Sequence, residues 1–109
     1  MKKYKSMITG NLDIFLIQNR EEFNGNVQNW YDVMIHGDPE GLESMAMLLL
    51  KIAKLDQDKI KDIPVGAREH VHLRPKIDLS SSSVNTIIGR LDAKGTGVFY
   101  DRYKAAKTK

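Results

Sequence analysis

The sequence predicts an α+β fold in which a mostly antiparallel sheet of five to six strands carries one long helix packed on a face. One long apolar run has helical spacing, and short β-prone runs separated by turn residues lie on both sides of it. An amphipathic helix has to bury its apolar face against another layer, and the short strands supply that layer. The 109 residues (1–109) are enough for a single domain with its own core.

The start of the helix is the clearest local signal. Asp38 can accept hydrogen bonds from the first free N–H groups of a helix, and Pro39 fits the first helical position, where its missing N–H costs nothing. Glu40 adds negative charge at the positive end of the helix dipole. We therefore expect a helix from about Pro39 to Leu55.

Helical spacing divides this segment into a broad apolar side and a narrow polar stripe. Met47 falls near the centre of the polar stripe, and Leu48 and Leu50 flank it. The apolar side is expected to be core, and it contains Leu42, Met45, Ala46, Leu49, Ile52 and Ala53. A solvent-exposed Met47 would be unusual unless a partner covers it.

Six runs have the composition of strands, and turn residues separate them. The expected strands are residues 4–9, 12–18, 30–35, 67–74, 86–91 and 98–103, the last of which is also compatible with a short helix. Thr9-Gly10-Asn11 resembles a hairpin turn between the first two. The asparagine-rich residues 19–29 are interpreted as a loop or a short irregular helix.

The net charge of +3 comes from the two ends of the chain. Residues 1–5 and 104–109, which we expect to be frayed, hold six of the 17 basic residues and none of the 14 acidic ones. The segment between them therefore has 11 basic and 14 acidic residues, a net charge of −3. Residues 13–62 hold ten of the acids against five basic residues.

The composition also restricts the class of protein. The absence of cysteine excludes disulfides and thiolate metal sites. No apolar run is long enough to span a membrane, and Met1-Lys2-Lys3 is not followed by the apolar core of a signal peptide. We therefore expect a cytoplasmic protein without a membrane partner.

The best candidate for a metal or catalytic site is His70 with His72, which alternation places on one face of a strand. A tetrahedral metal needs further ligands, for which His36, Asp32 or Glu69 are available. Because none of them is convincing, we predict no catalytic, metal or cofactor site. Arg90 and Asp92, with Arg68 and Glu69 on a neighbouring segment, are expected to form cross-strand ion pairs on a solvent face.

The sequence also contains aromatic residues at strand spacing that could stack on nucleic-acid bases: Trp30, Tyr31, Phe99, Tyr100 and Tyr103. Such a platform normally has basic groups around it. The mildly acidic body of the chain therefore disfavours a nucleic-acid partner.

Three segments in order carry a resemblance to a known family: residues 36–42 with the leucine-rich helix after them, residues 69–73, and residues 87–92. In this combination the chain resembles family 32 of the bacterial immunity proteins from polymorphic toxin systems, over roughly residues 30–100. The resemblance implies a non-enzymatic protein that binds a cognate toxin domain and neutralises it. It carries no catalytic residues with it.

The resemblance and the exposed Met47 together indicate a partner-binding helix face made of Glu40, Glu43 and Met47. Apolar anchors would supply most of the affinity, and acidic side chains would speed the encounter. Two alternatives stay open, a small metal-dependent enzyme that uses His70 and His72 and a homo-oligomeric structural module. The sequence leaves the identity of the toxin and the oligomeric state open.

Overall fold

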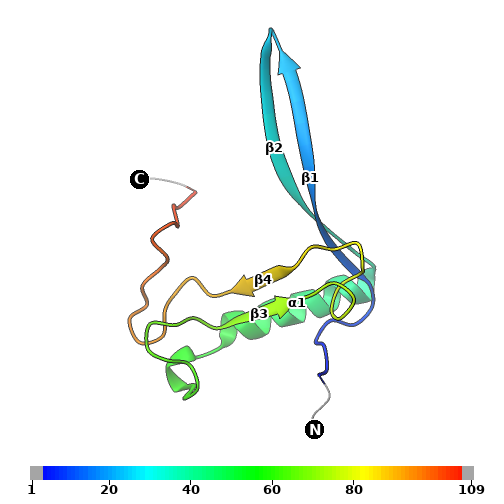
Figure 1. Cartoon of the computed structure of the whole chain (residues 1–109). Helices are drawn as coiled ribbons and strands as arrows, with labels where there is room; N and C mark the ends of the chain where they lie inside the picture. Colours follow the sequence, from blue (N-terminus) through cyan, green and yellow to red (C-terminus); the bar gives the residue numbers. More distant parts are fainter. Residues whose placement is uncertain (1–3, 107–109) are drawn as a thin grey trace.

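A computed structural model describes residues 4–106, and Figure 1 shows its ribbon. In chain order the elements are β1 (Leu12–Phe23), β2 (Asn26–Gly37), α1 (Pro39–Lys54), a short 3-10 helix (Gln57–Lys59), β3 (His70–Leu73) and β4 (Thr86–Gly89). β1 pairs with β2 and β3 pairs with β4, both antiparallel, so these strands form two separate two-stranded sheets. The outermost parts of the ends expected to fray, residues 1–3 and 107–109, lie outside the described residues.

The prediction of five to six strands in one sheet is wrong, although the α+β class agrees with the structure. Residues 4–9 and 98–103 are not strands, and several of their backbone groups bond to partners outside any sheet. The N–H of Thr9 donates to the Ser44 hydroxyl at 3.1 Å, and the carbonyl of Val98 accepts from the Arg68 guanidinium at 2.7 Å. Tyr103 N–H closes a turn onto Tyr100.

The segment interpreted as a loop, residues 19–29, is the outer half of a long hairpin that projects from the body (Figure 1). Its turn is Asn24-Gly25, where both residues have positive φ, 50° and 79°. Two consecutive left-handed residues form the two-residue turn whose twist matches that of antiparallel strands. The hairpin turn expected at Thr9-Gly10-Asn11 is therefore replaced by one much further along the chain.

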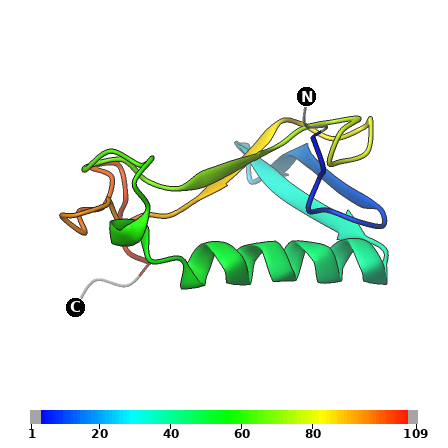
Figure 2. The same ribbon diagram turned by 90° about the horizontal axis from the view of Figure 1, so that it is seen from below.

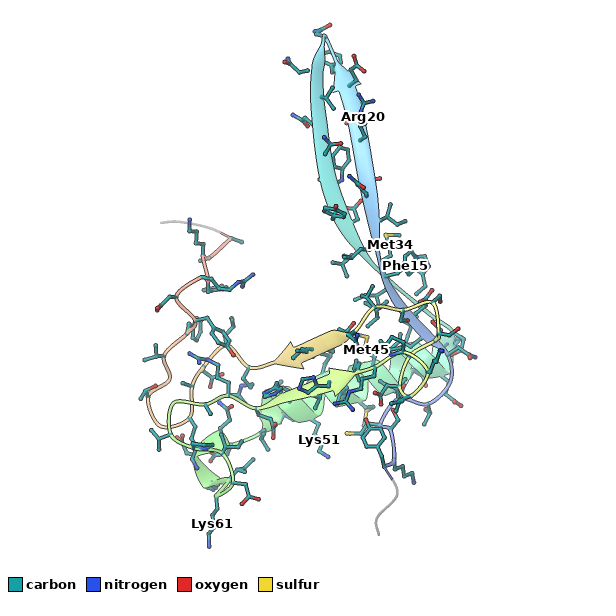
Figure 3. All side chains as sticks on the ribbon, in the orientation of Figure 1. Phe15, Arg20, Met34, Met45, Lys51 and Lys61 are labelled. Atoms are coloured by element: carbon teal, nitrogen blue, oxygen red, sulfur yellow. The ribbon has the colours of Figure 1, made fainter. Side chains whose placement is uncertain are left out.

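The core lies between α1 and the β3-β4 sheet, which covers one side of the helix in Figure 2. Met45, which Figure 3 labels, and the buried side chains of Leu48 and Ile52 face this core. The base of the hairpin and the flanking loops complete it with Ile8, Leu12, Ile14, Leu73 and Leu79. The one long helix therefore packs on a sheet of two strands and not on the predicted sheet of five to six.

The small sheet also corrects the expected core face of the helix. Leu48, expected beside the polar stripe, is only 2% exposed, whereas Leu49, expected in the core, is 42% exposed. The buried positions are Gly41, Met45, Leu48 and Ile52, which form one narrow stripe. Two strands cover only this stripe, and they leave the apolar residues Leu42, Ala46, Leu49 and Ala53 exposed.

A candidate protein-binding face

The start of α1 is fixed by Asp38, as the sequence predicts. Its Oδ1 accepts from Gly41 N–H at 2.7 Å and from Asn11 N–H at 3.0 Å, and its Oδ2 accepts from the Asn11 side chain at 2.7 Å. The hydrogen bonds from Asn11 and Gly41 hold the pKa of Asp38 below its usual value. The carboxylate therefore joins the first turn of the helix to the start of β1.

The end of α1 is fixed by Arg90, a role that the sequence did not reveal. The guanidinium donates to the carbonyls of Ile52 and Leu55 at 3.1 and 2.7 Å, and it forms a two-point ion pair with Asp92. The hydrogen bond from Arg90 lowers the pKa of Asp92. A cation at this position satisfies carbonyls that a helix end leaves free. The helix is thus held at both ends.

The side of α1 that faces away from the core is called here the outer face, and it comprises Glu40, Glu43, Met47 and Leu50. All four are exposed, and Met47 has 66% of its surface accessible. The predicted exposure of Met47 is therefore correct. The structure places the three predicted partner-binding residues on one surface of a helix whose two ends are fixed. Leu50, which helical spacing sets beside the polar stripe, is an exposed apolar neighbour of these residues.

Several acids that make residues 13–62 acidic have structural partners. Asp13 accepts hydrogen bonds from three serine hydroxyls, and these bonds lower its pKa. Asp56 caps the 3-10 helix, and Asp58 accepts from Gly95 N–H at 2.8 Å. Glu40 and Glu43, by contrast, make no side-chain hydrogen bond or ion pair with the described residues. Negative charge on the outer face is therefore available to a partner.

The structure places His70 and His72 together on the solvent side of β3, with ring centroids 5.1 Å apart. Val71 and Leu73 point to the opposite, core side, as strand alternation predicts. Within residues 4–106, no group of three or more histidine, cysteine, aspartate or glutamate side chains is arranged to hold a metal ion. His36 instead packs edge-on against Phe15 on the hairpin.

The aromatic residues considered for base stacking do not form one platform. Trp30 and Tyr31 lie on the projecting hairpin, whereas Phe99, Tyr100 and Tyr103 belong to the segment after β4. The Arg68 guanidinium lies 3.9 Å from the centre of the Tyr100 ring, so it is held within the body by cation–π contact and by carbonyls. No described helix is long and apolar enough to cross a membrane.

The structure is thus an α+β chain that exposes a partly apolar helix surface, and this helix is held at both ends. Residues 32–91 match the family model of Immunity protein 32 (Imm32). The match runs from the second half of β2 through β4 and covers 60 of the 109 residues. The chain therefore belongs to the Immunity protein 32 family. No curated protein and no solved structure matches it.

Proposed function

We propose that this protein binds one cognate toxin domain and thereby neutralises it. The observation that carries the proposal is the match of residues 32–91 to an immunity protein family. Binding, not catalysis, would be its activity. We further propose that the encounter takes place in the cytoplasm of a bacterium that also encodes the toxin.

The outer face of α1 is the proposed contact surface. Met47 supplies an accessible apolar side chain at its centre, and Leu50 extends the apolar area beside it. Interface energies are concentrated in such central anchors, while charged residues around them set the rate of encounter. Because Asp38 and Arg90 hold the two ends of the helix, little ordering would be needed on binding.

The function as a whole is tested by protection of cells. Cells that produce the toxin domain encoded beside this gene should survive when they also produce the protein, and the two purified proteins should form a complex. If cells die at the same rate with and without the protein, the proposal is wrong.

The Met47→Asp variant tests the contact surface. A charge at the centre of the interface should weaken binding to the toxin by about 2 kcal/mol or more, roughly 30-fold in Kd. The matched control is Val65→Asp, because Val65 is similarly exposed at 72% and lies outside α1. Isothermal titration calorimetry of both variants, with thermal unfolding to check the fold, gives the comparison. Equal affinities would exclude the outer face as the central contact.

Reversing both acids, Glu40→Lys and Glu43→Lys, tests the role of charge. We expect the association rate to fall by roughly tenfold at low salt and the difference to shrink as salt screens the charges. Stopped-flow association at several ionic strengths measures this dependence. An association rate that does not depend on these two residues at any salt concentration would contradict a steering role.

A further inference from the structure

The outer edge of β2 is a row of backbone groups without partners. On β1, the carbonyls of Leu12 and Ile14 accept from Ser80 and Val84, so the even-numbered residues of β1 point their backbone groups away from β2. Along an antiparallel pair, successive residues alternately direct their backbone groups toward the partner strand and away from it. Residues directly opposite each other behave alike, and Ile14 lies opposite Ile35. The odd-numbered residues of β2 therefore point away from β1, and they are Val27, Asn29, Tyr31, Val33 and Ile35. No hydrogen bond from the described residues reaches their main-chain groups.

This edge has few of the features that usually prevent strands from associating, because the one acidic side chain of β2, Asp32, accepts a hydrogen bond from Asn19 on β1. β2 contains no lysine, arginine or proline, and its twelve residues pair with β1 without a bulge. Tyr31, Val33 and Ile35 are exposed along it. Proteins commonly protect an edge strand with lysine, proline, a bulge or a covering loop. A long, regular and apolar edge such as this one is suited to pairing with another strand.

The chain also exposes more surface than a compact monomer of its size. It exposes 8908 Å², whereas a compact monomer of 12.4 kDa exposes roughly 6,100 Å². Its radius of gyration is 17.5 Å, against about 13 Å for a compact domain of this length. The difference in area, roughly 2,800 Å², exceeds the 800 Å² or so that one partner buries in a standard interface. Figure 3, which labels Arg20 far out on the hairpin, shows where much of this surface lies.

The uncharged side chains of this edge favour a second copy of the chain as its occupant. A two-fold interface brings the same patch together twice, so a charged patch would repel itself. All five side chains on the β2 edge are uncharged. The outer face of α1 would instead set the acidic pair Glu40 and Glu43 against its own copy.

We propose that two copies of this protein pair antiparallel through their β2 edges to form a four-stranded sheet in the order β1-β2-β2-β1. Pairing about Val33 sets Val33 against its own copy and Tyr31 against Ile35, an aromatic and β-branched pair of the kind that stabilises sheets. It also sets Asp32 opposite Met34, so that the two Asp32 side chains are diagonal neighbours roughly 7–8 Å apart and do not face each other directly. The pairing uses no residue of the outer face of α1, so it stands independently of toxin binding.

Sedimentation equilibrium and amide hydrogen exchange of the full chain test the proposal. The mass should approach twice 12.4 kDa at protein concentrations up to about 100 μM, because assembly depends on protomer concentration. The amides of Tyr31, Val33 and Ile35 should exchange at least about tenfold more slowly in the dimer than those of Gln18 and Arg20, which point outward on the opposite edge. A monomer at every concentration, or equally fast exchange at both edges, would overturn the proposal.

Two matched variants distinguish pairing at the edge from packing of the hairpin face. Val33→Lys places a charge against its own copy and should give a monomer, whereas Leu16→Lys should remain dimeric. Leu16 lies directly opposite Val33 on the same face, with 52% against 63% exposure, but it belongs to β1. Circular dichroism of both variants verifies that the hairpin forms. A dimeric Val33→Lys, or equal loss of dimer in both, would contradict edge pairing. Protection of the β2 amides only when toxin is added would assign the edge to the toxin instead.

Discussion

Replacing Gly41 with alanine should destabilise the protein by about 3 kcal/mol, even though alanine is the better helix former by about 1 kcal/mol. A β-carbon at this position would overlap the carbonyl oxygen of Asn11 and lie 2.6 Å from its carbonyl carbon. Neither segment can move away easily, because Asp38 binds both Asn11 and Gly41. Because the backbone at Asn11 lies so close to the first turn of α1, position 41 requires glycine.

Urea unfolding measures this effect. The control is Glu40→Ala in the same turn, which removes an exposed side chain and should change the unfolding free energy by less than about 0.5 kcal/mol. A more stable Gly41→Ala variant would show that the backbone at Asn11 and the first turn of α1 can move apart at no cost in free energy. The contact described between Asn11 and the helix would then be wrong.

The helix start could be predicted because its determinants are neighbours in the sequence. Asp38 and Pro39 act on the first turn of the helix that they precede, and the structure begins α1 at Pro39. The need for glycine at position 41 could not be predicted in the same way. It depends on Asn11, which is 30 residues away in the chain and is brought there by the hairpin.

The turn of the hairpin carries a local sequence signal that outweighs the loop interpretation of residues 19–29. Asn24-Gly25 is a strong turn signal for a two-residue hairpin, and both residues adopt the left-handed conformation that such a turn requires. The polar residues around it favoured a loop, because asparagine is common in turns. Twelve consecutive residue pairs outweigh that local preference.

The division into two sheets had no comparable signal. Residues 4–9 have the composition of a strand, but the N–H groups of Ile8 and Thr9 donate to the hydroxyls of Ser6 and Ser44. Whether a β-prone segment joins a sheet depends on which partner reaches it, and that is a long-range property. The exposed position of Met47 was easier to predict. The exposure of Met47 follows from helical spacing alone, whereas the role of Arg90 at the end of α1 depends on contacts across more than 30 residues.

Helical spacing alone did not place the core face of α1 correctly, because the apolar side of the helix is broader than the sheet that covers it. Spacing put Leu49 near the middle of the apolar side and Leu48 at its edge. The structure buries Leu48 against the β3-β4 sheet and leaves Leu49 partly in solvent. An apolar residue on a helix is core only where another element actually covers it.

Leu48→Ala should therefore cost about 2–5 kcal/mol of unfolding free energy, since it removes a side chain that is 2% exposed and leaves a cavity. Leu49→Ala makes the same chemical change one residue further along, where 42% of the side chain is already in water. We expect it to cost less than about 1 kcal/mol, because little buried area is lost. Urea unfolding of the two variants under identical conditions measures the difference. A Leu49→Ala variant that loses as much stability as Leu48→Ala would mean that another surface covers the exposed apolar stripe in solution, and α1 would then have a partner on that side.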